Sequence, residues 1–160
     1  VKEGHHIMTW ALTRPFAEVE TYMQHFEDAL ALAPGIERPR FMTMRHTAIF
    51  ENDAEKDIHI AAVQHQGRQF ENLFRNLEPV LNVFPQPADP EVLVNQSEYT
   101  EENLMNNLIF GSPEQAIENL KQYETLGVDY FCYNASFGVP MAEQKKSLRL
   151  FIDKVMPAFQ

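Results

Sequence analysis

The sequence predicts an α/β fold with parallel strands, on two observations. Short apolar runs of strand length alternate along the chain with longer segments in which apolar residues recur every three or four positions. Each pair of successive strands is joined through a helix, which makes the strands parallel and the crossovers right-handed. We therefore expect about three parallel strands with helices and one long insertion, in the order strand, helix, strand, helix, insertion, helix, strand, helix.

The first strand and helix are expected within residues 4–35. Residues 7–10 (Ile-Met-Thr-Trp) end a strand that leads into a loop. Pro15 suits the first position of a helix, because its φ is fixed near the helical value and its missing N–H needs no partner there. The apolar residues that follow at steps of three and four form one stripe: Phe16, Val19, Met23, Phe26 and Leu30. Pro34 and Gly35 end this helix.

The second strand is predicted over residues 41–50, which form an apolar run interrupted by Arg45 and His46. A strand places these two side chains on opposite faces, so at most one of them points inward. Both need partners if they are buried. Either they line a polar barrel interior near a cofactor, or they pair with carboxylates of neighbouring helices, and the second arrangement is preferred.

A helix capped by Asn52 or Asp53 is expected from residue 54 to about residue 67. Helical spacing continues beyond it, but four prolines make the next stretch irregular: Pro79, Pro85, Pro87 and Pro90. We therefore expect an irregular insertion over about residues 68–108, which ends in a short helix capped by Thr100. A long loop beside the carboxyl ends of strands is more often a lid or a binding loop than a neutral connection.

The last third of the chain carries the clearest pattern. Ser112 caps a helix, Pro113 fits its first position and Gln115 completes a capping box. The apolar stripe of this helix comprises Ala116, Ile117, Leu120, Tyr123 and Leu126. Gly127 ends the helix, because glycine readily adopts the positive φ of a C-terminal cap. Residues 128–133 are mostly apolar rather than alternating, which favours a strand covered on both faces before a final helix.

Several motifs of this last segment occur together in a known family. They are Ile109-Phe110-Gly111-Ser112-Pro113-Glu114-Gln115, Leu120, Leu126-Gly127-Val128-Asp129, Leu148, Phe151 and Val155-Met156-Pro157. In these residues the chain resembles the luciferase-like flavin-dependent monooxygenases and their deazaflavin-dependent relatives. The similarity is close over this last segment and loose over the rest. A helix followed by a Gly-Val-Asp turn also occurs in other α/β barrels, whereas the terminal Val-Met-Pro is less common.

The resemblance implies that the chain is the C-terminal part of a (β/α)8 TIM barrel. Such a barrel typically needs about 250 residues, whereas the chain has 160 and begins with Val rather than Met. We therefore expect residues 1–160 to be a single partial domain, with upstream sequence missing. A half barrel leaves unpaired strand edges and an apolar sheet face, so the N-terminal half of the barrel or a homo-oligomer partner is expected to cover them. Length alone also allows a complete small α/β domain.

The resemblance also implies a chemistry. Family members hold reduced flavin (FMN) or, in relatives, a deazaflavin at the carboxyl mouth of the barrel, and the flavin enzymes use O₂ to oxidise a small organic substrate. Much of the flavin contact and the ionisable catalytic group come from earlier strands in that family. No residue of this chain is therefore assigned a catalytic role, and the chain alone is expected to be inactive. The alternative is a non-catalytic association or weak flavin-binding module.

Candidate binding residues follow from the expected architecture, because sites gather at the carboxyl ends of parallel strands. They are Trp10, His46, Arg68, Phe70, Arg75 and Asn134. The aromatic and basic residues at the start of the insertion could stack on a flavin or substrate and pair with an anion. The alternative is that its phenylalanines are core residues and its arginines lie at the surface. Trp10 either forms the wall of a pocket or serves only in packing.

Charge and composition exclude several classes of function. A formal net charge of −10 argues against a general nucleic-acid or anionic-membrane surface, since these need clustered Lys and Arg. No apolar run in the sequence approaches the length of a membrane span. The six histidines form no known zinc motif, so no metal is expected. The single Cys132, expected to be a buried small hydrophobe, excludes an internal disulfide and suits a reducing compartment, so we expect a cytoplasmic protein.

Overall fold

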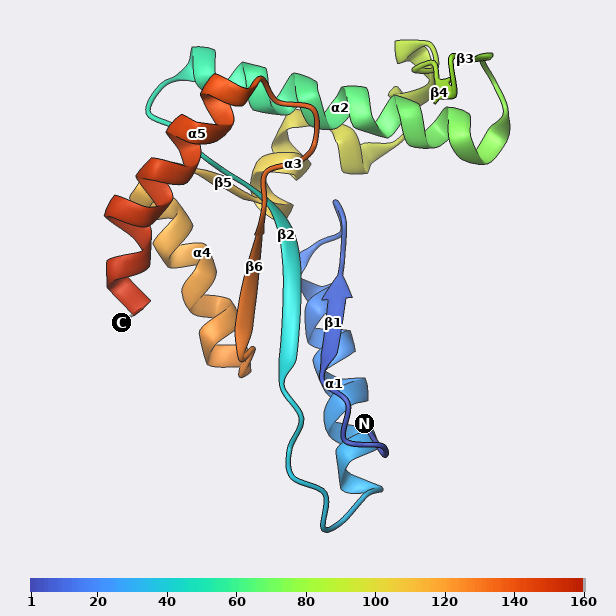
Figure 1. Cartoon of the computed structure of the whole chain (residues 1–160). Coiled ribbons are helices and arrows are strands. Elements are labelled where there is room, and N and C mark those ends of the chain that lie inside the picture. The colour runs from blue at the N-terminus through green and yellow to red at the C-terminus, as the bar shows by residue number, and fades with distance from the viewer. Residues whose placement is uncertain (160) are drawn as a thin grey trace.

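The computed structural model describes residues 1–159 and contains a parallel sheet with long helices around it (Figure 1). The main elements are β1 (Ile7–Trp10), α1 (Phe16–Ala31), β2 (Phe41–Ile49), α2 (Asp53–Arg75), β3 (Val80–Leu81), β4 (Phe84–Pro85), α3 (Glu101–Asn107), β5 (Ile109–Gly111), α4 (Pro113–Leu126), β6 (Tyr130–Asn134) and α5 (Met141–Leu150). Short 3₁₀ turns at Pro90–Leu93 and Ser97–Tyr99 precede α3, and helical turns at Phe151–Val155 and Met156–Phe159 extend α5. Within residues 1–159, each helix is too short or too polar to cross a bilayer.

The nine-residue strand β2 is the centre of the sheet. Its first part pairs in parallel with β1 on one side, from Ile7 opposite Phe41, and with β6, from Tyr130 opposite Met42. Its last three residues pair in parallel with β5. The prediction of parallel strands joined by helices is therefore confirmed. Strands β6 and β5 therefore both pair with β2, β6 along residues 42–46 and β5 along residues 47–49.

The main sheet has four strands within the described residues, one more than the approximate number predicted. The missed strand, β5, is only three residues long, and all three of its residues are buried. So short a segment shows no alternation of its own, and only Leu108 separates it from the end of the preceding helix. Periodicity alone therefore could not separate it from α3.

The boundaries of the insertion also differ from the prediction. α2 passes through Gly67 and continues to Arg75, so the irregular segment begins after Asn76 rather than at residue 68. Asn76 ends the helix in the left-handed conformation, with φ 57°. The insertion then forms the small β3–β4 hairpin and two 3₁₀ turns before α3. Thr100 caps α3 as predicted, because its hydroxyl accepts a hydrogen bond from the Asn103 N–H.

The two faces of the sheet differ in what covers them. On one face Phe41 of β2 packs against Phe26 of α1, with ring centroids 5.3 Å apart, and Phe131 of β6 packs against Tyr123 of α4 at 5.9 Å. The opposite face carries Met8 of β1 and Tyr130 of β6, which are 52% and 54% exposed. The prediction that the last strand is covered on both faces was therefore wrong. We call this second face the open face.

Helix α4 begins and ends as the sequence predicts. Ser112 accepts a hydrogen bond from the Gln115 N–H while the Gln115 side chain accepts one from the Ser112 N–H, which completes the capping box. Gly127 has φ 90° and ends the helix. The turn that follows is fixed by Asp129, whose carboxylate accepts from the Phe41 N–H and pairs with Arg38 at 2.8 Å. This arrangement connects the start of β6 to the start of β2.

Candidate functional site

Three of the predicted binding residues lie on the open face near the carboxyl ends of the strands. The ring of Trp10, at the end of β1, stands edge-on to the His46 ring with 5.9 Å between centroids. Asn134, the last residue of β6, is the register partner of His46 in the sheet. Its side-chain oxygen accepts a hydrogen bond from the Ser136 N–H and so shapes the loop that follows. The alternation of β2 and the parallel register bring these residues together.

His46 is 2% exposed, although it belongs to the open face. The ring of Phe137, from the loop after β6, packs on it with centroids 4.8 Å apart. The pKa of His46 is lowered to about 4, chiefly by burial and also by the neighbouring Arg45 charge, while a hydrogen bond with the Gln66 side chain acts in the opposite direction. Its Nδ1 has no hydrogen-bond partner among residues 1–159. The imidazole is therefore neutral near pH 7 and keeps one unpaired ring nitrogen.

Arg45 points to the opposite face, as the alternation predicts, and is fully buried. Its guanidinium donates to the Arg14 carbonyl at 2.7 Å, to the Leu12 carbonyl and to the Asn107 carbonyl. The predicted pairing of Arg45 and His46 with carboxylates was therefore wrong. Backbone carbonyls at the end of α3 and in the loop before α1 accept from its two terminal nitrogens, because these segments converge on β2, while its Nε has no hydrogen-bond partner among residues 1–159. Arg45 thus joins three segments and does not face a ligand site.

The predicted residues on α2 do not converge on one site. Arg68 donates its Nε–H to the Ala88 carbonyl and so holds the insertion against α2. Arg75 is exposed and pairs with Glu71 one turn earlier, at 3.0 Å. Phe70 is half-buried, whereas Phe74 is 80% exposed. The alternative was that these phenylalanines are core residues and these arginines lie at the surface. It is wrong for Phe74, which is exposed, and it is right for Arg75.

A small cavity lies between His46 and α2. Its lining includes Gln66, Gly67, Phe70 and Tyr99, and its volume is about 10 Å³. This is about the space that one water molecule requires. The Tyr99 ring closes the cavity from the side of the insertion. It can approach α2 closely because Gly67 has no side chain.

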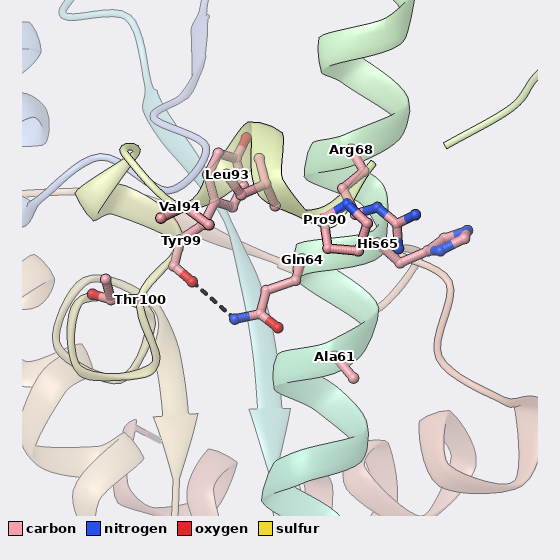
Figure 2. Close-up of a pocket in the computed structure, with 9 residues that line it drawn as sticks. All are labelled: Ala61, Gln64, His65, Arg68, Pro90, Leu93, Val94, Tyr99 and Thr100. Atoms are coloured by element: carbon pink, nitrogen blue, oxygen red, sulfur yellow. Dashed lines mark hydrogen bonds between the residues drawn. The ribbon is translucent and has the colours of Figure 1, made fainter. Parts of the chain in front are cut away.

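A larger groove lies beside the same Tyr99 (Figure 2). It has a volume of about 500 Å³ and runs between α2 and the 3₁₀ turns of the insertion. Gln64 closes one side by donating to the Tyr99 carbonyl at 3.0 Å. His65 and Arg68 line its α2 wall together with Gln64. Only Arg68 was predicted here, although the spacing of Gln64, His65 and Arg68 on one helix face could have indicated the others.

Gly67→Ala is expected to lower the free energy of unfolding by about 1–3 kcal/mol, the usual cost of overpacking. An ideal Cβ at position 67 would lie 2.5 Å from Cε1 of the Tyr99 ring. The same change in an unobstructed helix would stabilise the protein by up to about 1 kcal/mol. Urea unfolding of the variant and the wild type shows whether the free energy of unfolding falls or rises.

The matched control for this prediction is the double variant Gly67→Ala with Tyr99→Ala, compared with Tyr99→Ala alone. Once the ring is removed, the alanine at position 67 should be neutral or stabilising. A destabilisation of equal size in both backgrounds would contradict the contact.

The open face is suited to a flat apolar ligand. Trp10 stands at its edge, and Met44 and Cys132 are half-buried and adjacent in the register. The expectation that Cys132 is buried is therefore wrong, because no helix within residues 1–159 covers this face of β6. No group of three or more His, Cys, Asp or Glu side chains in residues 1–159 is arranged to hold a metal ion.

Comparison with known proteins gives relatives of one general kind. The chain is 31% identical over 161 aligned positions to the oxygenase component of flavin-dependent trigonelline monooxygenase from Acinetobacter baylyi. The alignment covers 99% of this chain and 44% of that protein, so the chain spans less than half of its relative. No family model matches the chain.

Two solved structures have a similar fold. One is an F420-dependent secondary alcohol dehydrogenase in complex with an F420-acetone adduct, with a TM-score of 0.62 over 97% of this chain and 43% of that chain. The other is the monooxygenase RslO1 from Streptomyces bottropensis, with a TM-score of 0.60 over 99% of this chain and 43% of that chain. Both are 16% identical to this chain, so they show the fold alone.

Proposed function

Because the chain resembles the C-terminal half of the luciferase-like flavin-dependent monooxygenases, we propose that it forms that half of an oxidoreductase that uses reduced flavin and O₂ to oxidise a small organic substrate. The single observation that carries the proposal is the 31% identity along nearly the whole chain to a flavin-dependent oxygenase component. FMN is the cofactor we propose, with a deazaflavin as the alternative. A cytoplasmic location is part of the same proposal.

The residues of the open face fit a flavin ring. Trp10, Met44 and Cys132 offer an aromatic and two polarisable sulfur-bearing side chains on one apolar surface, and such surfaces accept flat aromatic ligands. A bound reduced flavin would supply the electrons for the reaction with O₂. These three residues would hold the ring, and no further geometry is assigned.

His46 and its neighbours would contribute in two ways. Phe137 and α2 exclude water from the imidazole, which keeps it neutral near pH 7. A neutral imidazole with an unpaired Nδ1 accepts a hydrogen bond or a proton at that atom when its Nε2 carries the hydrogen. Because His46 is 2% exposed and covered by Phe137, a polar group of a ligand on the open face would meet this atom only after Phe137 moves off the ring.

Quenching of Trp10 fluorescence tests the proposal, because Trp10 is the only tryptophan of the chain. Adding FMN to the 160-residue chain is expected to quench Trp10 emission along a saturating curve, and the Trp10→Phe variant should lose this signal. N-acetyltryptophanamide at equal absorbance is the control for light absorption by FMN. Equal quenching of the control and the chain would refute flavin binding at this face.

The alternative function is a non-catalytic association module, favoured by the open apolar face around Met8 and Tyr130. The two functions differ in activity. A longer protein that joins this chain to an N-terminal barrel half should consume O₂ with reduced FMN and substrate, whereas an association module should not. Size-exclusion chromatography adds a second criterion, since a stable monomer of the 160-residue chain would argue against both an open half barrel and an association surface.

A further inference from the structure

We propose that the groove between α2 and the insertion binds a small organic carboxylate with an apolar body. The inference follows from the groove itself and holds whether or not the chain takes part in flavin chemistry. Its volume of about 500 Å³ falls in the range of small-molecule sites in proteins, about 300–1,000 Å³.

The two walls of the groove differ in chemistry. The α2 wall presents Gln64, His65 and Arg68, which succeed one another on one helix face. The opposite wall presents apolar residues of the insertion: Pro90, Leu93, Val94 and the Tyr99 side chain. Figure 2 shows Ala61 and Gln64 on α2, with Leu93 and Val94 of the insertion on the other side of Gln64. A ligand that satisfies both walls needs a polar anionic end and an apolar remainder.

The charge of the groove is opposite to that of the chain. The chain carries 23 acidic and 13 basic residues, yet none of the nine residues that line the groove is acidic. Arg75, two turns further along α2 on nearly the same face, pairs with Glu71, whereas no carboxylate of residues 1–159 lies within ion-pair distance of Arg68. The groove therefore combines two side chains that can carry positive charge with no internal counter-ion.

Arg68 is held in place for this role. Its Nε–H donates to the Ala88 carbonyl, which fixes the plane of the guanidinium and leaves the two terminal nitrogens for another acceptor. A guanidinium fixed in this way binds a carboxylate through two parallel hydrogen bonds. Because Ala88 belongs to the insertion, the same contact keeps the apolar wall next to the cation.

The position along the helix favours a carboxylate over a phosphate. Phosphate sites usually gather several free backbone N–H groups at a helix N-terminus or a glycine-rich loop. The groove lies beside residues 61–68, in the interior of α2 (Asp53–Arg75), where backbone N–H groups bond within the helix. Side chains alone therefore supply its donors, and a planar anion suits one guanidinium best.

Isothermal titration of the 160-residue chain tests the site with benzoate, benzamide and inorganic phosphate as probes. Benzoate should bind, and benzamide, which has the same shape without the charge, should bind at least about 10-fold more weakly, as expected for loss of a charge-assisted contact. Phosphate should bind more weakly than benzoate. Equal binding of benzoate and benzamide, absence of benzoate binding, or preferential binding of phosphate would each overturn the proposal.

Variants locate the binding on the groove. Arg68→Gln and His65→Glu should each weaken benzoate binding by about 10-fold or more, since one removes a charge and the other adds an opposing one. Arg75→Gln on the same helix is the matched control and should leave binding unchanged. His65 makes no contact that holds the insertion, so His65→Glu remains informative if Arg68→Gln unfolds the insertion. Unchanged binding in the folded His65→Glu variant would refute the site.

Discussion

Arg45→Met is expected to lower the free energy of unfolding by about 3–5 kcal/mol, the cost of breaking a buried charged hydrogen-bond network on one side. The guanidinium is fully buried and donates to the carbonyls of Leu12, Arg14 and Asn107. Methionine fills a similar volume but donates nothing, so three buried acceptors lose a partner. Urea unfolding followed by circular dichroism measures the change.

The control for this prediction is the same substitution at an exposed arginine. Arg75→Met removes only a surface pair with Glu71 and should cost less than about 1 kcal/mol. If Arg45→Met were as mild as Arg75→Met, the carbonyls around Arg45 would have to be satisfied in another way, and its role in joining three segments would be wrong.

Acidification from pH 6.5 to pH 4 is expected to lower the free energy of unfolding by about 3 kcal/mol through His46. Burial lowers its pKa from 6.5 to about 4 in the folded chain. Between these values the unfolded chain binds a proton that the folded chain does not, so stability falls as the pH falls and this loss levels off below pH 4. Urea unfolding at several pH values measures the slope.

The His46→Phe variant isolates this contribution, because phenylalanine fits among the rings of Trp10 and Phe137 and does not titrate. The pKa of His59 is also lowered by burial, and that of Asp129 is lowered by its hydrogen bonds. The wild type and the His46→Phe variant therefore both lose some stability in acid. The difference between wild type and variant should nevertheless grow between pH 6.5 and pH 4. Parallel curves over this range would contradict a neutral buried His46.

Much of the local structure could be predicted from the residues themselves. The capping box of Ser112 and Gln115, the stop at Gly127 and the cap of Thr100 are all present, because each depends on hydrogen bonds within one turn of helix. The resemblance to the luciferase-like family is confirmed by the flavin-dependent relative, and the partial barrel by two solved structures of which this chain covers 43%. The roles of the six predicted binding residues stay predictions.

Other features could not be predicted, because they depend on contacts between distant parts of the chain. Gly67 was expected near the end of a helix, but it lies inside α2. A glycine is needed there because the ring of Tyr99, 32 positions later, packs against this part of the helix. Arg45 was expected to pair with carboxylates, but it donates hydrogen bonds to backbone carbonyls, among them that of Arg14 in the loop before α1. The open face of β6 has the apolar composition of a buried strand, and only the arrangement of helices shows that one side is uncovered.

The sequence by itself determined the alternation of the longer strands and helices, the caps at Thr100, Ser112 and Gly127, and the parallel direction of the sheet, because periodicity, capping and crossover connections are local or topological properties. Only the tertiary structure decided that His46 is buried and neutral, that the terminal nitrogens of Arg45 donate to backbone carbonyls, and that Gln64, His65 and Arg68 line a groove beside apolar residues of the insertion. These properties depend on burial and on which distant segments lie within a few ångströms of each other, and the alternation of residues along the chain contains no such information.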